Sequence, residues 1–135
     1  MDESVSVTPP LPPIPVKRVL FIEDEHFISE LYMHTLSKAG YNVKVVFDGL
    51  EGFNEAKTNA YDIILLDLMI PSMLGIDLLK RLRAEVPDLR AKILITTNLE
   101  QTKEHRKEIE DQADGYVIKA EITPRQMVDF LSHLA

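Results

Sequence analysis

Carboxylate side chains follow two strongly apolar runs of this 135-residue chain, and they are the residues best suited to chemistry. Asp67 follows the run 61–66, and Glu23 and Asp24 follow the run 19–22. Parallel strands that end at one edge of a sheet would bring these carboxylates together. Such an acidic pocket binds a hard divalent cation through oxygen atoms. It also presents one carboxylate oxygen as a nucleophile to an electrophile.

A hydroxyl and an ammonium group are expected at the same edge. Thr97 ends the apolar run that begins at Ile93, and Lys119 ends the run 115–118. Taken singly, each residue is weak evidence, because an aspartate after a strand is usually a turn residue and a lysine there is usually solvated. The joint placement of all these groups after four separate strands is what favours a functional site.

The elements that must position these side chains alternate between strand and helix. The runs 63–66 and 93–95 are apolar on both faces, as in central parallel strands. The segments between the strands carry apolar residues at helical spacing. Five strand–helix units predict a doubly wound α/β fold with its site at the carboxyl ends of the strands. The predicted strands are 19–22, 41–47, 63–66, 93–95 and 115–118.

Several helix boundaries are indicated by single residues. Gly40 is expected to stop the first helix. Asp48 is expected to cap a short helix that buries Leu50, Phe53 and Ala56. Thr123 is expected to cap the last helix, with Pro124 at its first position. These signals place the ends of three of the five predicted helices.

The predicted fourth helix, 101–112, differs from the others because charged residues dominate it. Its apolar support is thin and comes from Leu99, Ile109 and Ala113. Polar helices are held weakly by packing. We therefore expect this helix to shift easily.

Composition excludes several classes of function. The net charge of −7 argues against direct binding of nucleic acid or of anionic membranes. The chain has no cysteine, which excludes disulfides and thiolate chemistry. No apolar stretch reaches membrane-spanning length, and the first residues do not form a signal peptide. A cytoplasmic location fits these observations.

The first 15 residues stand apart from the rest. They contain five of the eight prolines, which predicts a disordered, extended tail at 1–15 and a folded domain at 16–135. The proline spacing also suits a proline-recognition groove, although an unfolded leader is the preferred interpretation.

The chain resembles the receiver domain of bacterial-type response regulators over residues 16–135. The resemblance rests on Glu23-Asp24, on the segment from Asp67 through Pro71 to Gly75, and on Thr97 and Lys119 at similar spacing. It implies a flavodoxin-like five-stranded parallel sheet of order 2-1-3-4-5, flanked by five helices.

The resemblance also implies a role for each residue. Asp67 would accept a phosphoryl group from a sensor histidine kinase or a phosphotransfer protein, in a reaction that depends on Mg²⁺. Lys119 would pair with one phosphoryl oxygen and Thr97 would donate to another. The implied Mg²⁺ ligands are Asp24 and Asp67 directly, Glu23 through water, and the backbone carbonyl of Met69.

The response to phosphorylation is expected at Tyr116, which occupies the position of the switch aromatic in the resemblance. Its rearrangement would change the surface of the fourth helix, the fifth strand and the fifth helix. That surface would bind a downstream partner or form a homodimer, or it would act on an output domain that this chain lacks. The alternative interpretation is that Tyr116 is an ordinary half-buried strand residue.

Two residues depart from the pattern of the family. Asn98 stands beside the phosphoryl site where a small residue is usual, which affects the expected phosphoryl lifetime. Ala120 replaces the proline that usually follows the lysine, often through a cis bond. A cis bond without proline costs ~2.5–4 kcal/mol. The Lys119–Ala120 bond is therefore expected to be either trans or strained.

Two other classes of function remain open. A pseudo-receiver would share the fold and bind a partner without being phosphorylated, and only Asn98 and Ala120 support it. A phosphohydrolase with an aspartyl nucleophile usually needs a second acid two residues further on, where this chain has Met69. We therefore expect a phosphoaccepting signalling domain that is not a classical enzyme.

Overall fold

The structure, a computed structural model, describes residues 17–98 and 103–134. The predicted tail at 1–15 and the domain start at residue 16 lie outside the described residues. Leu99 and the first two residues of the predicted fourth helix lie outside them as well.

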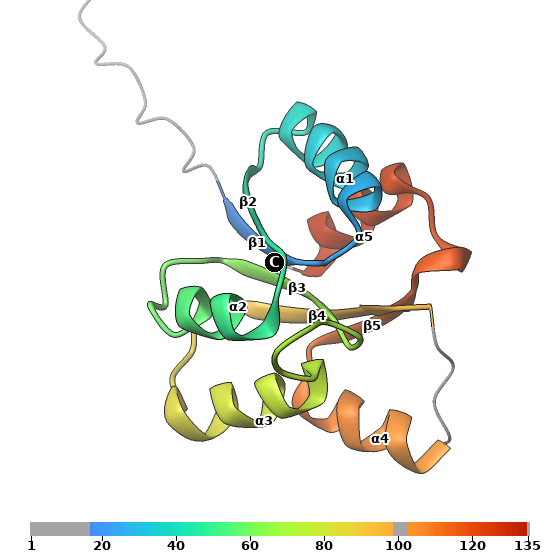
Figure 1. The fold of residues 1–135 in the computed structure, drawn as a ribbon. Coiled ribbons are helices and arrows are strands. Elements are labelled where there is room, and N and C mark those ends of the chain that lie inside the picture. Colours follow the sequence, from blue (N-terminus) through green and yellow to red (C-terminus); the bar gives the residue numbers. More distant parts are fainter. Residues whose placement is uncertain (1–16, 99–102, 135) are drawn as a thin grey trace, which may run out of the picture.

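The described strands form one parallel five-stranded sheet of order β2-β1-β3-β4-β5 (Figure 1). This finding confirms the predicted fold class and strand order. Each end of each observed strand falls within two residues of its predicted limit. The strands are β1 (Arg18–Ile22), β2 (Asn42–Val46), β3 (Ile63–Asp67), β4 (Lys92–Thr97) and β5 (Gly115–Ile118).

Five α-helices cover the two faces of this sheet. Figure 1 shows α1 and α5 on one face, and α2, α3 and α4 on the other. A short 3-10 helix, η1 (Lys119–Glu121), follows β5 directly. The helices are α1 (His26–Lys38), α2 (Gly49–Ala56), α3 (Gly75–Glu85), α4 (Lys103–Gln112) and α5 (Pro124–Leu134).

Alternate residues of the central strand β3 supply the two halves of the core. Ile64 and Leu66 pack in the cluster that α2, α3 and α4 cover. Ile63 and Leu65 pack in the cluster that α1 and α5 cover. Because successive strand residues point to opposite faces, Asp67 belongs to the α1/α5 face. The alternation therefore decides which helices surround the predicted nucleophile.

The three predicted helix boundaries are confirmed. Gly40 adopts a φ of 100°, a left-handed conformation that suits glycine after a helix. The Asp48 side chain accepts a 2.8 Å hydrogen bond from the backbone N–H of Glu51. Thr123 Oγ1 accepts a 3.1 Å bond from the N–H of Gln126. These contacts satisfy N–H groups that a helix start otherwise leaves without partners.

The predicted burial of Leu50 is wrong, because its side chain is 51% exposed. The buried face of α2 is set by Gly49, Gly52, Phe53 and Ala56. A Cβ atom on Gly52 would lie 2.7 Å from Ile22, so this face of α2 lies directly on the sheet. Leu50 lies about a quarter turn away from that face and points to solvent.

The fourth helix has the polar character that its sequence predicted. Among its side chains that the structure describes, Ile109 alone is buried. Charged contacts to α3 supplement this anchor: Lys80 forms a 2.5 Å ion pair with Glu108, and Arg83 Nε donates a 2.7 Å bond to the carbonyl of Gln112. The position of α4 therefore depends strongly on charged and polar contacts with α3.

No helix within residues 17–98 or 103–134 is both long enough and apolar enough to span a membrane.

Candidate functional site

Three carboxylates meet at the carboxyl edge of the sheet. Each of Glu23, Asp24 and Asp67 offers an oxygen atom within 4.8 Å of the others. They meet because β1 and β3 are neighbouring parallel strands that end together, with Ile22 paired to Leu66. Glu23 and Asp67 are buried, whereas Asp24 is exposed. The edge thus carries an acidic pocket with one open side, as the sequence predicted.

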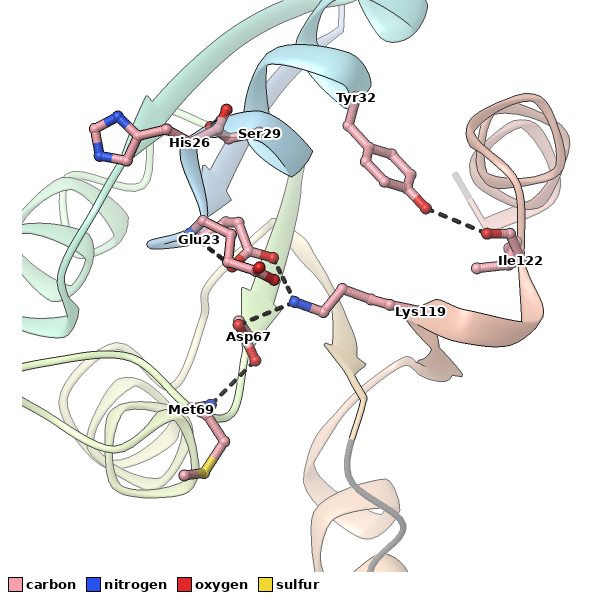
Figure 2. Close-up of polar contacts among 9 residues, drawn as sticks. Glu23, His26, Ser29, Tyr32, Asp67, Met69, Lys119 and Ile122 are labelled. Atoms are coloured by element: carbon pink, nitrogen blue, oxygen red, sulfur yellow. Dashed lines mark hydrogen bonds and ion pairs between the residues drawn. The ribbon is translucent and has the colours of Figure 1, made fainter.

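Lys119 enters this pocket from the far side of β4. Its Nζ donates to Glu23 Oε1 at 2.5 Å and to Asp67 Oδ2 at 3.1 Å, as Figure 2 shows. Its side chain is only 6% exposed. The ammonium group therefore bridges two buried carboxylates that come from different strands.

The Lys119–Ala120 peptide bond is trans, since the described residues contain no cis bond. The chain turns after Lys119 through η1 instead, and Ile122 N–H donates a 3.4 Å bond back to the Lys119 carbonyl. The trans bond still delivers Lys119 to Asp67. Of the two geometries that the sequence left open, the structure has the unstrained one.

The loop after β3 holds the second oxygen of Asp67. Oδ1 accepts a 3.0 Å bond from the backbone N–H of Met69. The loop is closed by the N–H of Gly75, which donates a 3.0 Å bond to the Leu68 carbonyl. The Met69 side chain is 54% exposed beside the pocket. Both oxygens of Asp67 are thus oriented by hydrogen bonds.

The remaining predicted residues also lie at or near the carboxyl edge. Thr97 is fully buried at the end of β4, and Asn98 follows it with an exposed side chain. Tyr116 is half-buried on the sheet face that α4 covers, and the Arg106 guanidinium lies 4.5 Å above its ring. The predicted roles of these residues stay predictions.

Burial and neighbouring charges tune the pocket. Burial raises the pKa of Glu23 to about 7; hydrogen bonding from Lys119 opposes this rise, and the charge of Asp67 adds to it. Burial alone would lower the pKa of Lys119, but the hydrogen bond to Glu23 and the charge of Asp67 raise it above its ordinary value. The pocket therefore keeps its cation while one of its carboxyl groups titrates near neutral pH.

The donor set fits a hard divalent cation. It consists of carboxylate oxygens only, held close together, with one exposed member that leaves room for water. Magnesium prefers such oxygen ligands and retains several waters. Glu23, Asp24 and Asp67 are thus chemically suited to Mg²⁺.

The pKa of Glu23 leads to a prediction about pH. A carboxyl group must lose its proton to take part in metal binding, so Mg²⁺ affinity should fall as the pH drops below about 7. In metal-free protein, pH acts on stability in the opposite direction. Folding raises the pKa of the Glu23 carboxyl from 4.5 to about 7, so the free energy of unfolding falls as the pH rises through this range.

Calorimetric titration with Mg²⁺ between pH 5.5 and 8 checks this expectation. The variant Glu23→Gln, which keeps the shape but cannot titrate, should have a flatter pH profile over the same range. An equally steep profile in the variant would show that another group controls the binding.

The fold and this pocket together define a class of protein: a flavodoxin-like domain with an acidic, lysine-bridged site at the carboxyl edge. Residues 19–132 match the family described as the response regulator receiver domain. The chain belongs to this family, whose members act in two-component signalling.

Individual relatives agree with this assignment. The chain is 36% identical over 102 residues to the transcriptional regulatory protein DltR of Streptococcus agalactiae, covering 76% of this chain and 45% of DltR. It is 30% identical over 102 residues to the response regulator ArlR of Staphylococcus aureus, and this match also covers 76% of this chain and 45% of the relative. The chain thus spans about half the length of these curated relatives.

A solved structure extends the comparison to the fold. The chemotaxis response regulator CheY4 of Vibrio cholerae superposes with a TM-score of 0.79 at 28% identity. The match covers 90% of this chain and 100% of that one.

Sequence reasoning missed one polar contact beside the pocket. The Tyr32 hydroxyl lies 3.4 Å from the carbonyl of Ile122, 90 positions further along the chain. Apolar residues at helical spacing predict the helix that carries Tyr32, but no spacing rule connects this side chain with that carbonyl.

Proposed function

We propose that this domain accepts a phosphoryl group on Asp67 from a sensor histidine kinase or a phosphotransfer protein, in a Mg²⁺-dependent reaction. The observation that carries the proposal is the pairing of Asp67 with Lys119 at 3.1 Å inside a cluster of three carboxylates. The carboxylate of Asp67, an ammonium group and two further carboxylates thus lie close together, which supports the proposal.

The chemistry needs positioning more than acid–base catalysis. An oxygen of Asp67 forms the new bond to phosphorus, while the bond from phosphorus to the donor nitrogen breaks and leaves its electron pair on the histidine. Lys119 then pairs with one phosphoryl oxygen, and the Thr97 hydroxyl donates to another. The Met69 N–H, already bound to Asp67, keeps the carboxylate oriented.

The metal would be held by Asp24 and Asp67 directly, by Glu23 through water, and by the backbone carbonyl of Met69. When bound, Mg²⁺ supplies positive charge that offsets the negative charge gathered in the pocket. Asn98, exposed next to Thr97, would influence how long the phosphoryl group survives.

The output would follow from Tyr116. A shift of Thr97 toward the phosphoryl group lets the half-buried ring move inward, and the α4-β5-α5 surface changes with it. A downstream protein, an output domain or a second copy of the chain would then bind this surface. Such a domain would work in the cytoplasm.

Mass spectrometry after incubation with acetyl phosphate and Mg²⁺ tests the proposal. One phosphoryl mass should be added to the wild-type chain and should be missing in Asp67→Ala. Asp88→Ala, which changes an exposed aspartate in the turn between α3 and β4, is the matched control and should still be labelled. A wild-type chain that binds Mg²⁺ without gaining mass would favour the pseudo-receiver instead.

A further inference from the structure

Tyr32 is a buried tyrosine that the proposed reaction does not use. It lies on α1 with 5% of its surface exposed, in the cluster between the sheet and helices α1 and α5. Its ring meets the ring of Phe21 edge to face, with centroids 5.8 Å apart. A phenylalanine would fill the same space, so the hydroxyl group needs a separate explanation.

The hydroxyl is directed at the turn that follows Lys119. Figure 2 shows Tyr32 reaching from α1 toward Ile122, where its O–H donates to the backbone carbonyl at 3.4 Å. Ile122 N–H in turn donates to the Lys119 carbonyl at 3.4 Å, which closes η1. Two hydrogen bonds thus connect α1 with the backbone of Lys119.

This connection matters because the backbone at Lys119 has no rigid residue next to it. Ala120 follows the lysine through a trans bond, and an alanine leaves φ unrestricted where a proline would fix it. The turn must therefore be held by contacts with other elements. The Tyr32 hydroxyl supplies one of these contacts from α1, the helix that follows the Glu23-Asp24 pair.

The protonation state of the phenol suits a donor. Burial raises the pKa of Tyr32; Lys119 acts against this shift and Glu23 acts with it. The hydroxyl therefore keeps its proton at neutral pH. Lys119 and Glu23 are thus the two charged groups of the pocket whose fields reach the phenol.

We infer that Tyr32 is a positioning residue for phosphoryl transfer: its hydroxyl fixes the turn after Lys119 and thereby the place where the ammonium group meets the phosphoryl oxygen. The inference rests on the proposed function of Asp67. Tyr32 touches neither Asp67 nor the proposed metal ligands in this role; it acts through the backbone of residues 119–122.

The test compares Tyr32→Phe with wild type in the full chain. Hydrogen exchange, which needs no phosphorylation, should be faster for the amides of residues 119–122. The rate of Asp67 phosphorylation by acetyl phosphate at saturating Mg²⁺ should fall about threefold to tenfold, the rate equivalent of one neutral hydrogen bond. The Kd for Mg²⁺ should change much less than the phosphorylation rate, because Lys119 is not itself a metal ligand.

Tyr61→Phe is the matched control. Tyr61 is buried to a similar degree, and its hydroxyl donates to Glu55 at 2.7 Å next to the start of β3, at the opposite edge of the sheet. This variant should lose stability but should change neither the exchange of residues 119–122 nor the phosphorylation rate.

Four results would contradict the inference or the proposed function on which it rests. Unchanged exchange in Tyr32→Phe would overturn the inference, as would faster exchange with an unchanged phosphorylation rate. A parallel loss of Mg²⁺ affinity would also overturn it, because it would show general damage to the pocket. If wild type gains no phosphoryl mass, the proposed function fails first, and the exchange data still report whether Tyr32 holds the turn.

Discussion

Replacing Lys119 by methionine should destabilise the metal-free protein by about 3 kcal/mol at pH 8, the usual cost of breaking a buried ion pair by removing one partner. The substitution keeps an unbranched side chain but leaves Glu23 and Asp67 buried without their cation. The two carboxylates then repel each other, and burial disfavours the charged form of Glu23.

The loss should shrink at pH 5.5. The pKa of Glu23 is already about 7 with Lys119 present, and removal of the lysine raises it further. A protonated Glu23 needs no counter-charge, so the variant recovers stability as the pH falls. Urea unfolding at both pH values, with a chelator present, measures this difference.

Glu23→Gln combined with Lys119→Met is the control. Because the neutral amide replaces the carboxylate, the double variant should lose much less stability at pH 8 than Lys119→Met alone. A loss of equal size at both pH values in the single variant would instead assign the effect to packing.

Replacing Gly75 by alanine should lower stability by about 2 kcal/mol and slow the phosphorylation of Asp67 by about 10- to 100-fold. A Cβ atom at this position would lie 2.6 Å from the Asp67 carbonyl oxygen and 2.6 Å from the Leu68 Cα. Both are backbone atoms, so a rotamer change cannot relieve the contact. The backbone that carries the nucleophile must move.

Helix propensity alone would make the Gly75→Ala variant more stable, which is the opposite of the predicted effect. Gly75 begins α3, where alanine is the better helix former by up to about 1 kcal/mol. A net loss therefore means that the steric contact outweighs the gain. Thermal unfolding and phosphorylation rates measure the two effects.

Gly40→Ala is the matched control, because a Cβ atom there has no neighbour within 4 Å. Its φ of 100° makes alanine costly for the backbone, so stability should fall, while phosphorylation should not change. If both variants lost phosphorylation equally, the contact of a Cβ at position 75 with the backbone of Asp67 and Leu68 would not explain the loss.

The sequence allowed the fold to be predicted because its signals are local. Continuous apolar runs gave the central strands, and single residues such as Gly40, Asp48 and Thr123 marked helix ends. The meeting of Glu23, Asp24 and Asp67 followed from one rule, that parallel strands end at a common edge. The same rule placed Lys119 at this edge, and the structure has its ammonium group between two of these carboxylates.

The features that escaped prediction depend on three-dimensional distances. Leu50 was placed in the core by its type, but Gly52 brings a different face of α2 against the sheet and leaves Leu50 exposed. The bond from Tyr32 to Ile122 spans 90 positions and arises only when α1 docks beside η1. The trans geometry after Lys119 was one of two predicted options, and only the coordinates could choose between them.

The attachment of α4 to α3 should depend on the salt concentration. Ile109 is its one buried anchor among the described side chains, and the partly exposed pair Lys80–Glu108 joins it to α3. Dissolved ions screen exposed pairs of this kind, with a Debye length of about 8 Å at physiological ionic strength and about 3 Å at 1 M. A higher ionic strength should therefore weaken this pair and loosen the attachment of α4 to α3.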